Sequence, residues 1–121
     1  MISVGEPAPD FTLPDQGGQE VSLSDFKGQR VLLVFYPLDF SPVCSDQLTL
    51  YRDIAPQLKE AGVTPLGISV DSAFAHKAFQ DHLGIDTTLL ADFEPKGAVA
   101  SAYGAYLDGA GHSNRSLVLI D

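Results

Sequence analysis

The residue best suited to chemistry is Cys44, the only cysteine among 121 residues. If Ser41 is the N-cap of a helix and Pro42 its first residue, Cys44 is the third helical residue. Backbone N–H groups in a first turn lack helical acceptors and carry the positive end of the helix dipole, so they favour a thiolate. A cysteine in that position has a pKa below the free value of about 8.5 and is a candidate nucleophile.

The elements on either side of Cys44 place it at the edge of a sheet. The run Val-Leu-Leu-Val-Phe-Tyr at residues 31–36 predicts a strand buried on both faces, which Pro37 ends. A helical period then extends to Gly62, and Pro56 should kink that helix. Open α/β sheets bind ligands beyond the carboxyl ends of their strands, which is where Cys44 is predicted to lie.

The rest of the chain completes an α/β pattern. A helix capped by Ser72 and ended by Gly84 is predicted between two strands, and a shorter helix should run from Pro95 to about Ala102. Turns are expected at residues 15–18 and 108–114, each joining two strands. The remaining strands are expected at residues 11–13, 20–23, 63–70, 87–91, 103–107 and 116–121.

Two β–helix–β crossovers followed by a hairpin predict a central mixed sheet flanked by helices. This order resembles a thioredoxin-like fold with an N-terminal β-hairpin extension, and we expect residues 1–121 to form a single domain. The chain stops directly after a strong strand, at residues 117–120. Because a doubly wound domain usually has a covering element next, we expect the native protein, or the pattern of its family, to continue further.

Composition excludes several classes of partner. The formal net charge is −9 and the pI is about 4.4, which argues against nucleic acid and against an anionic membrane face. We see no signal peptide, and the longest apolar run is too short to span a bilayer. One cysteine allows no internal disulfide, no Cys-x-x-Cys pair and no multi-cysteine zinc site. We therefore expect a cytoplasmic protein without a cofactor or metal.

The motif Pro37-x-x-x-Ser41-x-x-Cys44 resembles the signature of the peroxiredoxins. The opening Gly5-x-Pro7-Ala8-Pro9-Asp10-Phe11 is also similar to the usual start of this family, and Arg115 lies where the family carries its active-site arginine. The likeness covers essentially the whole chain. It is closest to the bacterial one-cysteine subgroup of the alkyl hydroperoxide reductase/thiol-specific antioxidant family.

The resemblance implies a thiol-dependent peroxidase. The Cys44 thiolate would attack the terminal oxygen of hydrogen peroxide or an organic hydroperoxide and become a sulfenic acid. Arg115 would lower the pKa of the thiol and hydrogen-bond the peroxide. The Ser41 hydroxyl could bond peroxide or thiolate, Pro37 would wall the site from water, and the N–H groups of Val43 and Cys44 would hold the developing charge.

Each supporting residue also has a simpler interpretation. Arg115 could be a surface charge, Ser41 a plain N-cap and Pro37 a strand terminator. Phe40, inside the loop, is placed to touch substrate or a partner subunit. The family often has Glu three residues after its cysteine, and here Gln47 can still bond Arg115 but supplies no charge.

The reductant must come from outside the chain. Thr49 stands where one subgroup places a resolving cysteine, so the sulfenic acid cannot be resolved internally. The resemblance therefore implies an external thiol or a thioredoxin- or mycoredoxin-like reductant, and a homodimer. Two alternatives stay open: a non-catalytic redox sensor or interaction module using Cys44 oxidation, and a purely structural cysteine. Turnover with thiol separates an enzyme from a sensor, which is oxidised once.

Other candidate side chains are given no chemical role at this stage. The three histidines have no defensible metal-ligand spacing, and we expect them at the surface. His76 and His82 are six residues apart on one helix and should point to different faces. Most large aromatic side chains are expected in the core, among them Tyr36, Phe74, Phe79, Phe93 and Tyr103.

Overall fold

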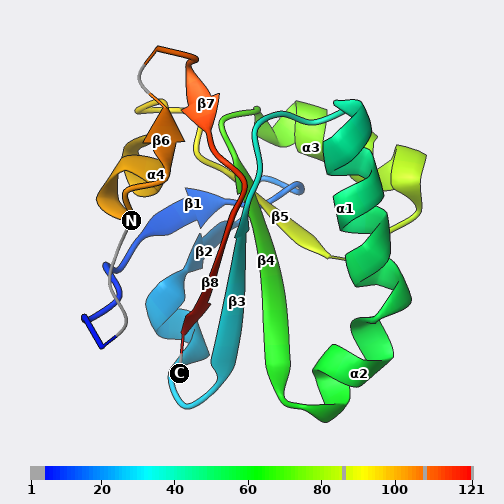
Figure 1. Cartoon of the computed structure of the whole chain (residues 1–121), viewed down its shortest axis with the longest axis vertical. Coiled ribbons are helices and arrows are strands. Elements are labelled where there is room, and N and C mark those ends of the chain that lie inside the picture. Colours follow the sequence, from blue (N-terminus) through cyan, green and yellow to red (C-terminus); the bar gives the residue numbers. More distant parts are fainter. Residues whose placement is uncertain (1–4, 86, 108, 121) are drawn as a thin grey trace.

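The computed structural model describes residues 5–85, 87–107 and 109–120, with the side chains of residues 42–46 left out. Its centre is a four-stranded sheet in the order β5-β4-β3-β8 (Figure 1). The β3–β4 and β4–β5 pairs are parallel, whereas β8 runs antiparallel to β3. These strands are β3 (Arg30–Phe35), β4 (Val63–Ser69), β5 (Thr88–Ala91) and β8 (Ser116–Ile120). The predicted mixed sheet and both crossovers are confirmed.

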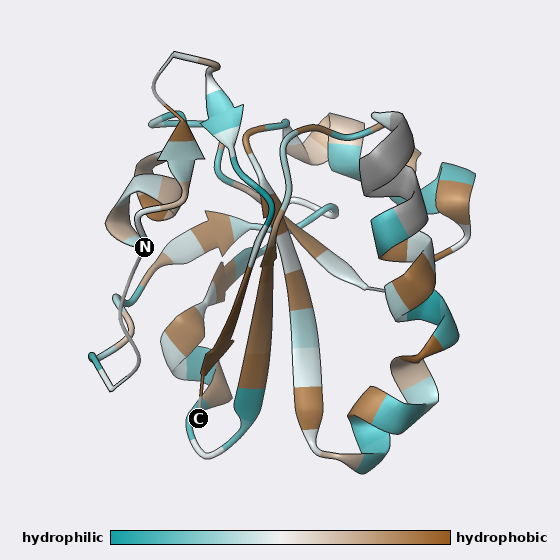
Figure 2. Cartoon of the chain, viewed as in Figure 1, coloured by the Kyte–Doolittle hydropathy of each residue, from teal (hydrophilic) through white to brown (hydrophobic). Residues whose placement is uncertain are grey.

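The sheet separates two apolar clusters, because side chains alternate along β3. Val31, Leu33 and Phe35 face the cluster under α4 and the N-terminal hairpin. Val34 and the following Tyr36 face the cluster under the other helices. Figure 2 shows β3 and β8 as the most continuously apolar strands of the sheet. The prediction that residues 31–36 are buried on both faces is confirmed.

The first crossover contains a break where a kink was predicted. Helix α1 (Pro42–Asp53) ends at Ile54, and a second helix, α2 (Ala55–Glu60), begins there in a new direction (Figure 1). Pro56 has no N–H to donate, and its ring clashes with the carbonyl four residues earlier, so the helix cannot continue through it. The proline instead occupies the first turn of α2, where it costs nothing.

The second crossover agrees closely with the sequence. Helix α3 (Ala73–Leu83) is capped by Ser72, whose hydroxyl accepts the Ala75 N–H at 3.2 Å. Gly84 ends it in the left-handed conformation, at φ 65°. α1, α2 and α3 lie on one side of the sheet (Figure 1).

Helix α4 (Ala98–Ala102) does not begin at Pro95 as predicted. Its first turn is closed by Asp92, whose carboxylate accepts the N–H groups of Val99 and Ala100 at 3.0 and 2.9 Å. The side chain that decides where the helix begins is therefore supplied from the end of β5. Burial raises the pKa of Asp92, although these two hydrogen bonds oppose the shift.

Two small hairpins lie outside the central sheet. β1 (Thr12–Pro14) pairs with β2 (Glu20–Ser22), which confirms the predicted N-terminal extension, and a 3-10 turn (Leu23–Phe26) follows. The predicted pairing of residues 103–107 with residues 116–121 is wrong. β6 (Tyr106–Leu107) pairs instead with β7 (His112–Ser113). β8 pairs with β3 in the central sheet. Asp108 and Asp121 lie outside the described residues.

Two aromatic side chains predicted for the core are exposed. Phe74 in the first turn of α3 is 88% exposed, and Phe93 after β5 is 53% exposed. Both follow the end of a strand, where side chains point beyond the sheet. In the described part of the chain, every helix is too short or too polar to cross a bilayer.

Candidate active site

The turn from β3 into α1 brings the predicted motif together. Tyr36 still belongs to the sheet edge, since its N–H donates to the Ile68 carbonyl at 3.2 Å. Pro37 is half-buried, and the chain bends sharply at Phe40, which has φ 66°. Ser41 is the N-cap residue of α1, so Cys44 is its third residue, as the sequence predicted.

The Ser41 hydroxyl does not cap the helix. It donates to the Leu38 carbonyl at 3.0 Å and closes a short loop. The oxygen keeps lone pairs that can accept a hydrogen bond from a bound molecule. Ser41 is therefore the N-cap residue by position, but its side chain does not make the capping hydrogen bond. The side chains of Val43 and Cys44 lie outside the described residues.

Sheet pairing places Arg115 beside helix α1, which follows residues 37–41, here called the reactive loop. Ser116 of β8 is opposite Phe35 of β3, and the Ser113 hydroxyl donates to the Tyr36 carbonyl at 2.9 Å. Arg115 Nη1 then donates to Gln47 Oε1 at 3.4 Å. Gln47 is one helical turn after Cys44, so the contact that the sequence suggested across 68 positions is present.

Phe40 lies against α3 with half of its surface open. Its ring centroid is 4.9 Å from that of Phe79 and 5.7 Å from that of His82. The side chain is 50% exposed. Contact of Phe40 with a substrate or a second subunit stays a prediction.

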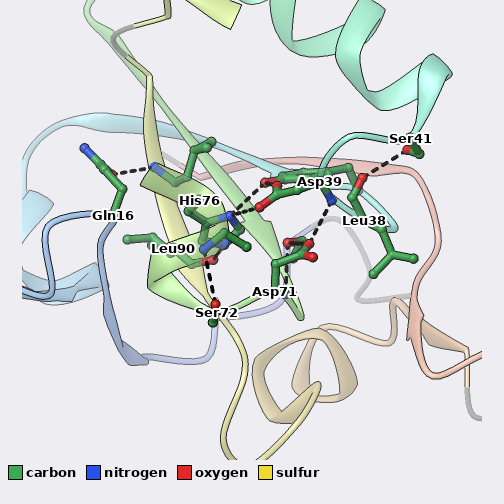
Figure 3. A network of polar contacts seen from close by, with 12 residues as sticks. Gln16, Leu38, Asp39, Ser41, Asp71, Ser72, His76 and Leu90 are labelled. Atoms are coloured by element: carbon green, nitrogen blue, oxygen red, sulfur yellow. Dashed lines mark hydrogen bonds and ion pairs between the residues drawn. The ribbon is translucent and has the colours of Figure 1, made fainter. Parts of the chain in front are cut away.

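A buried polar cluster beneath the loop was not predicted (Figure 3). His76, expected at the surface, is fully buried, and its Nδ1 is 2.7 Å from Asp39 Oδ2. Tyr36 donates its hydroxyl to Asp39 Oδ1 at 2.6 Å. His82 is exposed, so the prediction that the two histidines point to different faces is confirmed. A signal was available, because His76, Phe79 and Leu83 share one helical face.

The same cluster has the composition of a metal site. One donor atom each from Asp39, Asp71 and His76 lies within 4.8 Å of the others. Hydrogen bonds already use these atoms, however: both ring nitrogens of His76 contact acceptors, Asp39 Oδ2 and the Leu90 carbonyl. Both nitrogens are therefore already engaged within the protein. We interpret the cluster as a buried hydrogen-bonded network.

A cavity of about 800 Å³ lies at the opposite end of the sheet. Gly28, Arg30 and Val63 line it, at the point where β3 and β4 begin. Parallel strands present their ligand-binding loops at their carboxyl ends, so this cavity lies at the other end of the sheet from Cys44.

Comparison with known proteins identifies the family. The sequence model described as AhpC/TSA family matches residues 4–121. The chain belongs to the AhpC/TSA family. This confirms the resemblance found in the motif around Cys44 and in the opening segment.

Similar proteins within this family come from several organisms. Alkyl hydroperoxide reductase E of Mycobacterium tuberculosis is 42% identical over 122 residues, covering 100% of this chain and 80% of that protein. A putative peroxiredoxin bcp of Coxiella burnetii is 44% identical over 107 residues, covering 88% and 70%. Both similarities extend through the reactive loop and α1, because each covers most of the chain.

Solved structures agree with this assignment. Peroxidoxin BcpB from Mycobacterium tuberculosis superposes with a TM-score of 0.86 at 32% identity, covering 97% of this chain and 77% of that one. The reduced 2-Cys peroxiredoxin of Plasmodium vivax gives 0.87 at 35% identity, covering 98% and 78%. The predicted thioredoxin-like fold is thereby confirmed. The chain is a thiol-dependent peroxidase, and its single cysteine fits the one-cysteine type.

Proposed function

We propose that the chain reduces hydrogen peroxide and organic hydroperoxides by direct attack of the Cys44 thiolate. The sulfur bonds to the terminal peroxide oxygen, the O–O bond breaks, and water or an alcohol leaves after taking up a proton. Cys44 is oxidised to a sulfenic acid while the peroxide is reduced. The observation that carries this proposal is the position of Cys44 in the first turn of α1, with Arg115 bonded to Gln47 one turn further on.

Each residue around Cys44 would have a separate role in the reaction. Arg115 supplies a fixed cation and a planar donor group for the thiolate and the peroxide. Ser41, whose proton is donated to Leu38, accepts from the peroxide O–H. Pro37 covers the site without adding a donor that would compete for the peroxide. The backbone N–H groups of Val43 and Cys44 stabilise the charge that develops on oxygen.

Regeneration would use a thiol from another molecule. That thiol attacks the sulfenic sulfur, forms a mixed disulfide and releases water; a second thiol then frees Cys44 as the outside disulfide forms. Small thiols and thioredoxin- or mycoredoxin-like proteins have the required chemistry. The single cysteine of this chain supports the proposal, since no internal thiol is available.

We also propose a cytoplasmic homodimer in which residues 1–121 act as one domain. The reducing compartment is suggested by a chain without a possible internal disulfide. The dimer is suggested by Leu38, Phe40 and Phe74, three exposed apolar side chains on the reactive loop and the start of α3. Sedimentation equilibrium at micromolar concentration tests it, with Phe74→Ser expected to shift the population towards monomer.

Stopped-flow oxidation of Cys44 tests the peroxidase. We expect hydrogen peroxide and an organic hydroperoxide each to oxidise Cys44 at least about 10²-fold faster than they oxidise a free thiolate. This is the size of effect expected of one preorganised hydrogen-bond donor. One equivalent of peroxide should leave a sulfenic acid that dimedone traps, and added thiol should give repeated turnover. A single oxidation without turnover would support the redox sensor instead. Reaction at the rate of a free thiol would contradict both.

A further inference from the structure

The bend that starts α1 is held in an unfavourable backbone conformation. Phe40, at φ 66°, is the one non-glycine residue with positive φ among those the structure describes. The left-handed region is disfavoured for a side chain with a Cβ, and a bulky residue stays there only when its surroundings force it. The contacts on both sides of Phe40 therefore determine where the first turn of α1 points.

Asp39, immediately before the bend, is fixed by three hydrogen bonds. Its backbone N–H donates to Asp71 Oδ2 at 2.8 Å, beyond the end of β4. Its Oδ1 accepts the Tyr36 hydroxyl at 2.6 Å, and its Oδ2 lies 2.7 Å from His76 Nδ1. Both the backbone and the carboxylate of this residue are thus tied to the sheet and to α3.

His76 is the buried partner of the Asp39 side chain. Its Nε2 donates to the Leu90 carbonyl at 3.0 Å, since a carbonyl can only accept. Nδ1 and Asp39 Oδ2 are joined by a hydrogen bond of 2.7 Å. The side chains of His76 and Asp39 are 0% and 1% exposed. Water cannot replace either partner, so the pair tolerates little displacement.

Two further polar side chains, Tyr36 and Asp71, are hydrogen-bonded to Asp39. Tyr36 donates to Asp39, and the pKa of Tyr36 is raised well above its ordinary value by burial and by the nearby Asp39 carboxylate, so its hydroxyl keeps the proton that it donates. The Asp71 carboxylate is occupied by the Ser69 hydroxyl at 2.5 Å and by the Asp39 N–H. The cluster joins β3, β4, β5 and α3 directly below the reactive loop (Figure 3).

Contacts after the bend come from the same helix. The Phe40 ring packs on Phe79 and His82, three and six residues beyond His76 in α3. Ser41 is tied back across the bend by its bond to the Leu38 carbonyl. α3 therefore contacts both the residue before the bend, Asp39, and the residue at the bend, Phe40.

We propose that the buried Asp39–His76 pair positions the reacting thiolate: it fixes the bend at Phe40 and so aligns the first turn of α1 with Arg115. Asp39 and His76 are positioning residues, since neither contacts the reacting atoms. This inference rests on the peroxidase proposed above. In-line attack depends on alignment, whereas simple alkylation of the same thiolate tolerates a wider range of approach angles.

Two chemically identical substitutions provide the test. Asp39→Asn removes the carboxylate of the buried pair. Asp81→Asn removes the carboxylate of an exposed ion pair on α3, in which Lys77 Nζ lies 3.1 Å from Asp81 Oδ1. For each protein, the oxidation rate constant with hydrogen peroxide is compared with the alkylation rate constant with iodoacetamide, at a pH where the thiol is fully ionised. Circular dichroism first checks that each variant is folded, because the thiol of an unfolded chain would also react with both reagents.

We expect Asp39→Asn to slow oxidation by about 10- to 100-fold, the scale of a displacement of about 1 Å, and to change alkylation by less than about threefold. Asp81→Asn should match the wild type in both reactions. Equal falls in oxidation and alkylation would overturn the inference, since they would mean altered ionisation or access. Unchanged oxidation in folded Asp39→Asn would also overturn it.

Tyr36→Phe keeps the test decisive if Asp39→Asn does not fold. It removes one hydrogen bond from Asp39 and leaves the buried ring in place. We expect oxidation of Cys44 to slow by about three- to tenfold while its alkylation is unchanged. Equal falls in both rate constants, or an unchanged oxidation rate constant, would again contradict the inference. A wild type that reacts no faster than a free thiol would refute the peroxidase itself, whereas a fast wild type with equally fast variants refutes only the positioning role.

Discussion

Arg115 is oriented in this chain by a neutral amide. Its Nη1 donates to Gln47 Oε1 at 3.4 Å, where many relatives would have a glutamate by the motif resemblance. An amide oxygen directs the guanidinium without cancelling its charge, so more of the positive potential reaches the first turn of α1. The helix dipole acts in the same direction on that turn.

Replacement of Cys44 by serine should abolish peroxidase activity while the fold is kept. Serine is nearly isosteric with cysteine, but its hydroxyl is not ionised at neutral pH, so the nucleophile is lost. Turnover with hydrogen peroxide and thiol measures the effect, and circular dichroism checks the fold. A folded Cys44→Ser protein that kept more than a few per cent of wild-type turnover would refute the mechanism.

Arg115→Lys should slow oxidation by about 10²-fold or more, the loss expected for one preorganised donor. Lysine keeps the charge but loses the planar fork that can touch sulfur and peroxide together. Stopped-flow oxidation of Cys44 gives the rate constant. Lys96→Arg, a change between the same two residue types away from the reactive loop, serves as the control. Wild-type kinetics in Arg115→Lys would show that only a distant charge is needed.

At the scale of elements, the start of helix α4 depends on a side chain from outside the helix. α3 is capped by its own Ser72, but α4 takes its cap from Asp92 at the end of β5. The backbone of Asp92 is itself tied to the sheet, since its N–H donates to the Ser69 carbonyl at 2.8 Å. Strand β5 and helix α4 are therefore expected to unfold together.

Asp92→Ala should lower the free energy of unfolding by about 1–2 kcal/mol at pH 7, the usual loss for a helix cap. The substitution leaves the N–H groups of Val99 and Ala100 without their acceptor in a buried region. Urea unfolding followed by circular dichroism measures the change. Asp81→Ala, on the exposed surface of α3, should stay within about 0.5 kcal/mol of the wild type. Equal stabilities of the two variants would contradict the capping role.

At the scale of the molecule, Tyr103 ties the end of α4 to the N-terminal segment. Its hydroxyl donates to the Pro9 carbonyl at 2.6 Å, and its ring centroid lies 5.6 Å from that of Phe35 in β3. Burial, with a smaller effect of Asp10, raises the pKa of Tyr103 to about 12. The folded protein thus holds this phenolic proton more tightly than the unfolded chain does.

Stability should therefore fall as the pH rises from about 10 towards about 12. In this window the unfolded chain has already released the phenolic proton and the folded protein has not, so alkali favours unfolding. Tyr103→Phe should be less stable than the wild type below pH 10, and the difference should shrink above it. Urea unfolding at a series of pH values compares the two proteins, in which Tyr36 titrates alike. A constant difference across the window would contradict the assigned pKa.

Local sequence determined the features that depend on neighbouring residues. The doubly buried strand, the Ser72 and Gly84 ends of α3 and the helical position of Cys44 follow from side-chain period and from Pro, Ser and Gly chemistry. These signals act within a few residues, so they survive whatever the rest of the chain does. The motif around Cys44 is of this kind, which is why the family was recognisable from it.

Tertiary structure decided the contacts between distant segments. Nothing local indicates that β8 would pair with β3 rather than with residues 103–107, or that Asp92 would start α4. From the sequence, His76 was expected at the surface. It is buried because Asp39, 37 residues earlier in the chain, lies beside it and forms a hydrogen bond with it. A buried polar side chain is tolerated only when its hydrogen-bond partners are present, and these partners come together only once the sheet and α3 have packed.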